Sequence, residues 1–537
     1  MRFYLLNGCE MSDLLTTWQD LDWPDIKASK PLETGNGVID EEAFQTIEVD
    51  KVFTAVNHTQ TLTGQACLYR SLAQPLADKS AIDAKQQAVA ELQEQPELMA
   101  ALDAIVSDAA YHESSFYLLL FGSFLGTFGT ARSEHEIEGY GYHVYKKGVR
   151  LLPELSERLA SVDRPNSPYL TGLFDAFNAF SQSRAYSLMT DTVYVTEYSL
   201  QSKQERAHSW LPAVSFVPRL FKPLLFVAAA ILYWLLSHFA PTALFSAIPD
   251  EALLLTPFLL LYIPLVGGFD RDHCIIPLRK EYKASPDVAA ALDALGQLDE
   301  LLSFAKFSQR FPHETVLPTF NDSEHFALTL TQAKNPVLGA HITDYVGNDL
   351  SLTDERLLLI TGPNSGGKTA FCKTIAQIQL LAQTGSPIPA QAAQLTVADR
   401  VFYQATEISH LDDGEGRFGT ELKRTKDIFL ASSARSLVIL DELSEGTTFE
   451  EKMESSTNVL NGFYRKGNTT LLITHNHQLV DAFIKKRQGI AMQVEFADEA
   501  PTYRLIPGIS RVSHADRVAK KIGFSKEDID HYLENKQ

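Results

Sequence analysis

Residues 362–369 place glycines, a lysine and a threonine at the spacing of a phosphate-binding loop. The loop consists of Gly362, Pro363, Asn364, Ser365, Gly366, Gly367, Lys368 and Thr369. Glycines allow backbone N–H groups to converge on phosphate oxygens, and the N-terminus of a following helix adds positive potential. Lys368 is expected to contact the β- and γ-phosphates, and Thr369 to ligate Mg²⁺. The loop therefore predicts a binding site for a nucleotide with Mg²⁺.

Two further polar motifs lie downstream, each at the end of an apolar run. Asp441 and Glu442 follow the run at 436–440, and His475 follows the run at 469–474. Asp441 is expected to hold the magnesium ion, and Glu442 to orient or activate the attacking water. His475 is placed to sense the γ-phosphate. An acidic pair or a histidine at a strand end is more often simply solvated, and the complete loop upstream favours the functional interpretation.

These motifs need a parallel sheet to bring them together, and the surrounding sequence predicts one. The run LLLIT at 357–361 is typical of a buried strand and leads into the loop, and a helical segment follows. From about residue 314, short β-branched and apolar runs alternate with helices, as in an α/β domain with a largely parallel sheet. Ligands of such sheets bind at the carboxyl ends of the strands.

The chain upstream reads as mostly helical between 51 and about 200, and again at 287–311. Ala, Leu, Glu and Gln dominate there, and apolar residues recur at steps of three and four. With 537 residues, we expect two or three domains in a multidomain α plus α/β protein. The expected divisions are an N-terminal segment at 1–50, a helical domain at 51–330 and an α/β domain at 331–537.

Composition restricts the class of partner and the compartment. The net charge of −20 weighs against a protein that binds mainly to the phosphate backbone of nucleic acids, unless positive charge is concentrated locally. The four cysteines show no paired spacing, which fits a reducing compartment and offers no zinc site. The N-terminus lacks the apolar core and cleavage site of a signal peptide. We therefore expect the bulk of the chain in the cytoplasm.

Several segments together resemble the MutS ATPases of mismatch repair and their relatives. In the α/β part these are TGPNSGGKT at 361–369, GSPIPAQAAQLTVADRVF at 385–402, DELSEGTT at 441–448, ITH at 473–475, KNPVL at 334–338 and SHADRVAKKIGFSKEDI at 513–529. In the helical part, residues 59–92 and 298–308 look like the start of the family's core and lever domain and its long returning helix. The resemblance covers most of 51–534 and is strongest in the α/β part.

The resemblance implies a helical core and lever domain followed by a P-loop ATPase domain of the ABC type. It implies an ATP hydrolase, with ATP and Mg²⁺ bound at the interface of a homodimer and coupled to movement of the levers. The segment 513–529 would serve dimerisation. Glu442 and His475 would act in catalysis, the loop and Asp441 would bind the nucleotide, and Thr369 and Asp441 would hold Mg²⁺.

The sequence also departs from the family. We expect no mismatch-recognition domain and no connector domain, because the chain starts almost directly at the core domain. The family's serine that acts on the neighbouring subunit should fall within 412–422, where Gly416, Arg417 and Phe418 occupy its place. Arg417 either supplies positive charge to the neighbouring nucleotide, as an arginine finger does, or is simply an exposed arginine in an acidic loop.

A hydrophobic stretch, residues 223–269, occupies the place of the family's DNA clamp. It carries two formal charges, the adjacent Asp250 and Glu251, and is flanked by basic residues on both sides. This pattern predicts a transmembrane hairpin with both ends in the cytoplasm, although prolines interrupt its second half. The alternative is a buried helical hairpin or an apolar dimer interface.

Three functional hypotheses follow from these features. The first is a MutS-like ATPase, anchored in the cytoplasmic (inner) membrane, that couples ATP hydrolysis at a dimer interface to lever movement. The alternative is a MutS-type repair or recombination protein that binds mismatched or other DNA, with the apolar stretch buried. The third is a switch that binds ATP but turns it over poorly, given the absent serine. DNA binding is possible by resemblance, and the net charge and the missing domains disfavour it.

Overall fold

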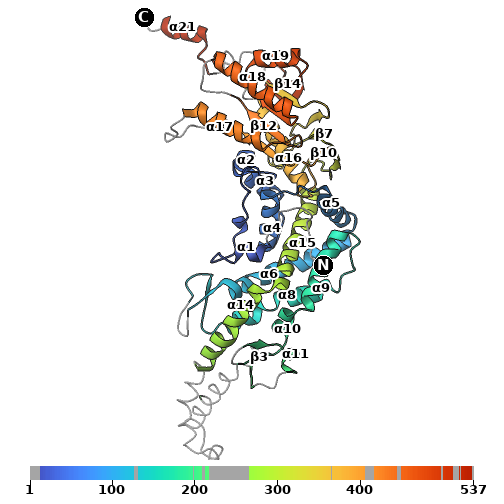
Figure 1. Cartoon of the computed structure of the whole chain (residues 1–537), viewed down its shortest axis with the longest axis vertical. Coiled ribbons are helices and arrows are strands. Elements are labelled where there is room, and N and C mark those ends of the chain that lie inside the picture. The colour runs from blue at the N-terminus through green and yellow to red at the C-terminus, as the bar shows by residue number, and fades with distance from the viewer. Residues whose placement is uncertain are drawn as a thin grey trace, which may run out of the picture.

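The computed structural model describes residues 13–125, 131–196, 199–208, 212–216, 231, 265–363, 366–405, 416–443, 449–497, 500–511, 519 and 522–534. Figure 1 shows an elongated molecule, with an α/β part at one end and a helical part extending from it. The predicted combination of a helical part with an α/β part is confirmed at this level. Helices also form where periodicity predicted them, between 51 and about 200 and within 287–311.

The helical part is built around one long helix, α15. Its helices are α1 (Leu14–Trp18), α2 (Glu41–Ile47), α3 (Val49–Val56), α4 (Leu62–Ala73), α5 (Lys79–Glu94), α6 (Pro96–Phe121), α7 (Tyr142–Gly148), α8 (Leu151–Leu159), α9 (Pro168–Ser181), α10 (Arg184–Thr190), α11 (Lys203–Arg206), α14 (Ile276–Ala284) and α15 (Pro286–Arg310). Short strands accompany them: β1 (Ser123–Phe124), β2 (Glu136–Ile137), β3 (Val193–Val195), β4 (Leu200–Gln201) and β5 (Val214–Phe216).

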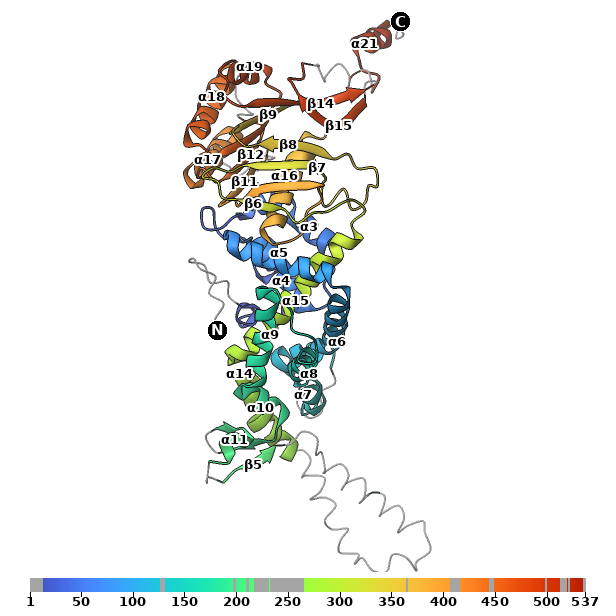
Figure 2. The same cartoon turned by 90° about the vertical axis from the view of Figure 1, so that its right-hand side faces the viewer.

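Helix α15 starts with strong local signals and is then surrounded by protein. The Ser285 hydroxyl accepts a hydrogen bond from the Val288 amide, and Pro286 occupies the first turn, where its missing N–H costs nothing. Helices α4, α5 and α9 pack around it. Together with α14 it runs from the α/β part along the helical part, as Figure 2 shows.

A six-stranded sheet forms the centre of the α/β part. Its order is β11 (Val401–Gln404), β12 (Leu437–Asp441), β13 (Thr469–Ile473), β9 (Leu357–Thr361), β14 (Ile490–Ala497) and β15 (Ala500–Pro507). All pairings are parallel except that of β14 with β15. Successive strand residues point alternately to the two faces of the sheet, and both faces are apolar. Helix α16 (Lys368–Gln383) covers one face, and α18 (Phe449–Lys466) and α19 (His477–Lys485) cover the other.

A smaller sheet and the N-terminal segment flank this centre. The smaller sheet has the order β6 (Thr319–Asn321), β10 (Ala392–Thr396), β7 (Leu328–Ala333) and β8 (Asn348–Leu352). Two further helices complete the described α/β part, α17 (Gly416–Ala431) and α21 (Lys526–Glu534). The N-terminal segment meets the large sheet at β11, where Ile39 forms a parallel bridge with Val401.

The structure contradicts the membrane localisation that we predicted. The expected hairpin at 223–269 lies outside the described residues, apart from Ile231 and residues 265–269. No helix in the described part of the chain is long and apolar enough to cross a bilayer. Just after the expected hairpin, the apolar side chains of Cys274, Ile275 and Leu278 are buried in the protein. The apolar character there serves the core.

Candidate functional site

The glycine-rich loop leaves the sheet at the end of β9, a strand whose residues are all buried. Gly362 and Gly367 have φ angles of +136° and +84°, which side chains rarely tolerate. A Cβ atom on Gly366 would lie 2.8 Å from Val494 Cγ2, so β14 leaves no room for a side chain. Gly367 then caps α16. Asn364 and Ser365 lie outside the described residues.

Lys368 folds back over the loop from the first turn of α16. Its ammonium group donates hydrogen bonds to the backbone oxygens of Gly362 at 2.7 Å and Pro363 at 2.9 Å. Burial lowers the pKa of Lys368, although the carboxylates of Asp441 and Glu442 act in the opposite direction. A cation held here by loop carbonyls is placed to exchange those partners for phosphate oxygens.

Thr369 and Asp441 meet across the sheet, although 72 residues separate them in the sequence. The Thr369 hydroxyl donates to Asp441 Oδ2 at 2.9 Å. Hydroxyl and carboxylate oxygens are ligands that Mg²⁺ prefers. This donor set therefore fits the predicted ion, with water and phosphate oxygens left to complete its coordination. Among the described residues, no group of three or more His, Cys, Asp or Glu side chains forms a metal cluster.

Glu442 stands beside this pair in a backbone conformation that is rare for glutamate. Its φ angle is +64°, and its amide donates to the Ile473 oxygen at 2.9 Å, which ties it to β13. One carboxylate oxygen lies 3.2 Å from His475 Nε2, and the other lies 3.6 Å from Lys452 Nζ. Such conformations cost about 1–3 kcal/mol and concentrate at functional sites. The predicted residues Glu442 and His475 are in contact.

Sequence reasoning missed Lys452 and Tyr503. Lys452 lies on α18, in a charged stretch that reads as a solvated helix face. Tyr503 lies on β15 with φ +61°, and its Cδ1 lies 3.3 Å from where a Cβ atom of Gly367 would be. Asn348 fixes this segment, because its amide donates to the Tyr503 oxygen and its oxygen accepts from the Leu505 amide. An exposed tyrosine in an edge strand carries no sequence signal of its own.

Most of the predicted site residues lie close together in the structure. They are Gly362, Pro363, Gly366, Gly367, Lys368, Thr369, Asp441, Glu442 and His475. They converge at the carboxyl ends of β9, β12 and β13, which are neighbours in the sheet. The side chain of Arg417 and residues 412–415 lie outside what the structure describes.

Comparison with known proteins places both parts of the chain in one family. A model described as MutS domain III matches residues 38–305, and one described as MutS domain V matches residues 358–535. The second match contains all of the residues that converge at the sheet edge.

Individual relatives agree with these matches. The chain is 30% identical over 255 residues to "Endonuclease MutS2" of Shouchella clausii, covering 47% of this chain and 32% of that protein. It is 32% identical over 268 residues to "DNA mismatch repair protein MutS" of Rhodopirellula baltica, covering 48% and 30%. It is 33% identical over 240 residues to "DNA mismatch repair protein MSH3" of Phaeosphaeria nodorum, covering 43% and 21%. The matched region thus spans about a third or less of each relative.

The names of the Rhodopirellula and Phaeosphaeria proteins refer to DNA mismatch repair. The predicted resemblance itself is confirmed, because domain models of one family match both the helical part and the α/β part. The chain is a member of the MutS family.

Proposed function

We propose that the site at residues 362–369 binds ATP with Mg²⁺ and hydrolyses it. The observation that carries this proposal is the 2.9 Å contact between Thr369 and Asp441, beside the strained Glu442. The match of residues 358–535 to MutS domain V supports it. Lys368 would leave the loop carbonyls for the phosphates, and the amides of the loop and of the first turn of α16 would hold the remaining oxygens.

Each remaining residue has a distinct role in this proposal. Thr369 and Asp441 would hold Mg²⁺, which supplies charge neutralisation for the phosphates. Glu442 would orient the attacking water and accept its proton, and His475 and Lys452 would fix its carboxylate. Tyr503, 55% exposed beside Gly367, offers an aromatic face on which the adenine ring would stack.

Turnover of Glu442→Gln distinguishes hydrolysis from a nucleotide-bound switch. The variant keeps the size of the side chain and removes its basic carboxylate. We expect a loss of about 100-fold in steady-state turnover or more, with the affinity for a fluorescent ATP analogue nearly unchanged. Glu450→Gln, at an exposed position on α18, is the matched control and should retain turnover. Equal, negligible rates in wild type and Glu442→Gln would instead identify a switch.

A role in DNA repair or recombination is the cellular function that we propose for this ATPase. It rests on the names of the relatives and on a local concentration of positive charge. In a chain of net charge −20, α7 and its C-terminal flank expose Lys146, Lys147 and Arg150. Binding of duplex and mismatched DNA, measured at rising salt, tests this role. Affinity that is undetectable at low salt would exclude direct DNA binding.

We further propose a homodimer. The C-terminal segment around α21 exposes several large apolar side chains, namely Ile522, Phe524, Tyr532 and Leu533. A second copy of the segment would remove this apolar surface from water. Sedimentation of the full chain and of the double variant Phe524→Ser with Leu533→Ser tests the proposal. Dimers that persist unchanged in the variant would exclude this surface as the interface.

A further inference from the structure

Helix α16 connects the candidate nucleotide site directly to the helical part. It begins at Lys368 in the loop and ends at Gln383, whose side chain is fully buried. Gln383 Nε2 donates to the Leu76 oxygen at 2.7 Å, and the Leu76 amide donates to the backbone oxygen of Gln383 at 3.0 Å. The same side chain exchanges two bonds of 3.0 Å with the Ala398 backbone. One residue thus ties α16 both to the α4–α5 connection and to the loop before β11.

The backbone just beyond α16 lies directly against α5. Gly385 has φ +84°, and a Cβ atom on it would lie 2.7 Å from Lys85 Cβ. Only glycine can occupy this position without moving one of the two elements. Because a helix is stiff along its axis, a displacement of α16 at Lys368 would reach α5 through two contacts, at Leu76 and at Lys85.

Lys85 carries the connection from α5 to the long helix α15. Its ammonium group lies 2.8 Å from Glu300 Oε2, and the two side chains are only 5% and 0% exposed. The same nitrogen lies 5.6 Å from the centre of the Phe304 ring, one turn further along α15. Water cannot replace either partner at this depth, so the pair holds α5 and α15 in one relative position.

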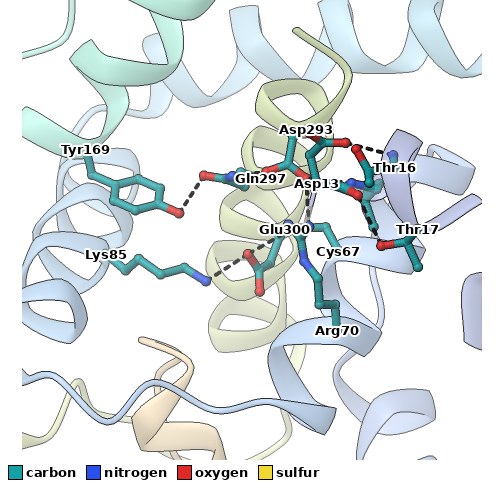
Figure 3. A network of polar contacts seen from close by, with 11 residues as sticks. Asp13, Thr16, Thr17, Cys67, Arg70, Lys85, Tyr169, Asp293, Gln297 and Glu300 are labelled. Carbon is teal, nitrogen blue, oxygen red and sulfur yellow. Dashed lines mark hydrogen bonds and ion pairs between the residues drawn. The ribbon is translucent and has the colours of Figure 1, made fainter. Parts of the chain in front are cut away.

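Polar contacts continue from Glu300 into two neighbouring helices, as Figure 3 shows. Glu300 accepts a hydrogen bond from the Cys67 thiol of α4, and Arg70 of α4 pairs with Asp293 of α15 at 2.8 Å. On the other side of α15, the Tyr169 hydroxyl of α9 donates to Gln297 at 2.8 Å. The Lys85–Glu300 pair therefore belongs to a network that joins α15 to α4, α5 and α9.

Stability alone is a weak explanation for this buried pair. Replacing a buried ion pair with apolar side chains of similar size is often neutral or stabilising, because both charges must lose their water. A buried ion pair has a preferred geometry, so it is better suited to fixing the position of one helix relative to another. Here the Lys85–Glu300 pair fixes α5 against α15, close to the end of α16, the helix that begins at the candidate nucleotide site.

We propose that Gln383 and the Lys85–Glu300 pair are positioning residues that transmit the nucleotide state of α16 to α15. We name these residues the joint. The proposal rests on the proposed function, because it requires a nucleotide at residues 362–369. It goes beyond it by assigning the contacts through which the site and the helical part affect each other. By linkage, the joint also carries the reverse effect, from the helical part to nucleotide affinity.

Hydrogen exchange on the full chain tests the joint. Exchange in α15 and α9 is measured without nucleotide and with Mg²⁺ and adenylyl imidodiphosphate, a non-hydrolysable ATP analogue. In wild type we expect the analogue to change the exchange of both helices. In the double variant Lys85→Met with Glu300→Leu, we expect an analogue affinity within about threefold of wild type and a loss of most of that change. Gln383→Met, which removes the side-chain bonds to Leu76 and Ala398 and keeps the backbone bond to Leu76, should act in the same direction with a smaller effect.

The control is a matched pair on the same helix. Lys79 and Asp83 form an ion pair at 2.7 Å that is 35% and 36% exposed, and Lys79→Met with Asp83→Leu should leave the response intact. Circular dichroism checks that the Lys85–Glu300 double variant is folded. If the analogue still changes hydrogen exchange in that variant, the proposal for the joint is wrong and the proposed ATPase function stands. Failure of wild type to bind the analogue would overturn the proposed function, and the joint with it.

Discussion

The candidate nucleotide site and the joint use polar residues in opposite ways. At the site, Thr369 is exposed and the His475 side chain is 40% exposed, while Lys368 and the Glu442 carboxylate beside them are largely buried. At the joint, Lys85 and Glu300 are almost wholly enclosed. The site also has a strained residue, Glu442, whereas Lys85 and Glu300 lie within regular helices. Side chains at the site can exchange their hydrogen-bond partners for a ligand. Side chains at the joint are enclosed and keep the partners that they have.

This difference separates the effects of substitution. A change at the site should alter ligand binding or chemistry while leaving the fold nearly as stable as before. A change at the joint should first alter stability, because an unpaired charge would remain inside the protein. The predictions below test whether the two regions behave in these two ways.

The largest effect is expected for Lys85→Met alone. It leaves the Glu300 carboxylate buried without its cation, which should lower the free energy of unfolding by about 3–5 kcal/mol. The double variant with Glu300→Leu should recover most of that loss. Urea denaturation of the single and double variants measures the difference. A partly exposed control, Lys79→Met, should cost under about 1 kcal/mol. If Lys85→Met is as stable as the double variant, the Lys85–Glu300 pair contributes no more to stability than a surface ion pair does.

Lys368→Ala should have the next largest effect, on binding and not on folding. The variant removes the cation that we place on the phosphates, so affinity for a fluorescent ATP analogue should fall by about 100-fold, or about 3 kcal/mol. The free energy of unfolding should change much less than in Lys85→Met. Lys485→Ala, an exposed lysine on α19, is the control. Unchanged affinity in Lys368→Ala would remove the loop from the proposed site.

Local sequence patterns predicted the strands of the site but not the contacts between distant segments. The apolar runs at 357–361, 436–440 and 469–473 became β9, β12 and β13, because burial and strand length are encoded within a few residues. The glycine loop is also local, since φ angles and close packing demand glycine at particular positions. Its ligand and chemistry remain predictions.

The joint had no such local signal. Gln383 and Leu76 lie 307 residues apart, and Lys85 and Glu300 lie 215 apart, so no periodicity could reveal either pair. The membrane prediction failed for a related reason. Hydrophobicity indicates that a segment avoids water, but not whether lipid or protein replaces it, and the described apolar residues just beyond the expected hairpin, Cys274, Ile275 and Leu278, are buried in protein. Tyr503 was missed because only the position of β15 brings its ring close to Gly367.

The helical part should also be sensitive to pH through Glu113 of α6. This carboxylate accepts a hydrogen bond from the Leu62 amide at the start of α4, and burial raises its pKa to about 7. The folded state therefore binds an extra proton between about pH 4.5 and 7, so stability should fall by about 3 kcal/mol as pH rises through that window. Urea midpoints at pH 5 and pH 8 measure the change.

Glu113→Gln is the matched variant for this pH dependence. Its amide oxygen can still accept from Leu62, but it carries no titrating proton, so the dependence on pH should flatten and stability at pH 8 should rise. Glu97→Gln, exposed on the same helix, should leave the pH dependence as in wild type. The same pH slope in Glu113→Gln and wild type would contradict the assignment of the slope to this carboxylate.

The smallest effect, and the sharpest contrast with the joint, is expected for Glu442→Gly. Its φ of +64° disfavours any residue with a Cβ atom, and glycine relieves that cost. The variant should therefore be more stable than wild type by about 1 kcal/mol, while turnover is lost with the carboxylate. Glu442→Gln loses the carboxylate but keeps the Cβ atom, so comparing urea midpoints of the two variants isolates the backbone effect. If Glu442→Gly is less stable than Glu442→Gln, the contacts of this side chain outweigh its strain, and the site holds its own structure together in the manner of the joint.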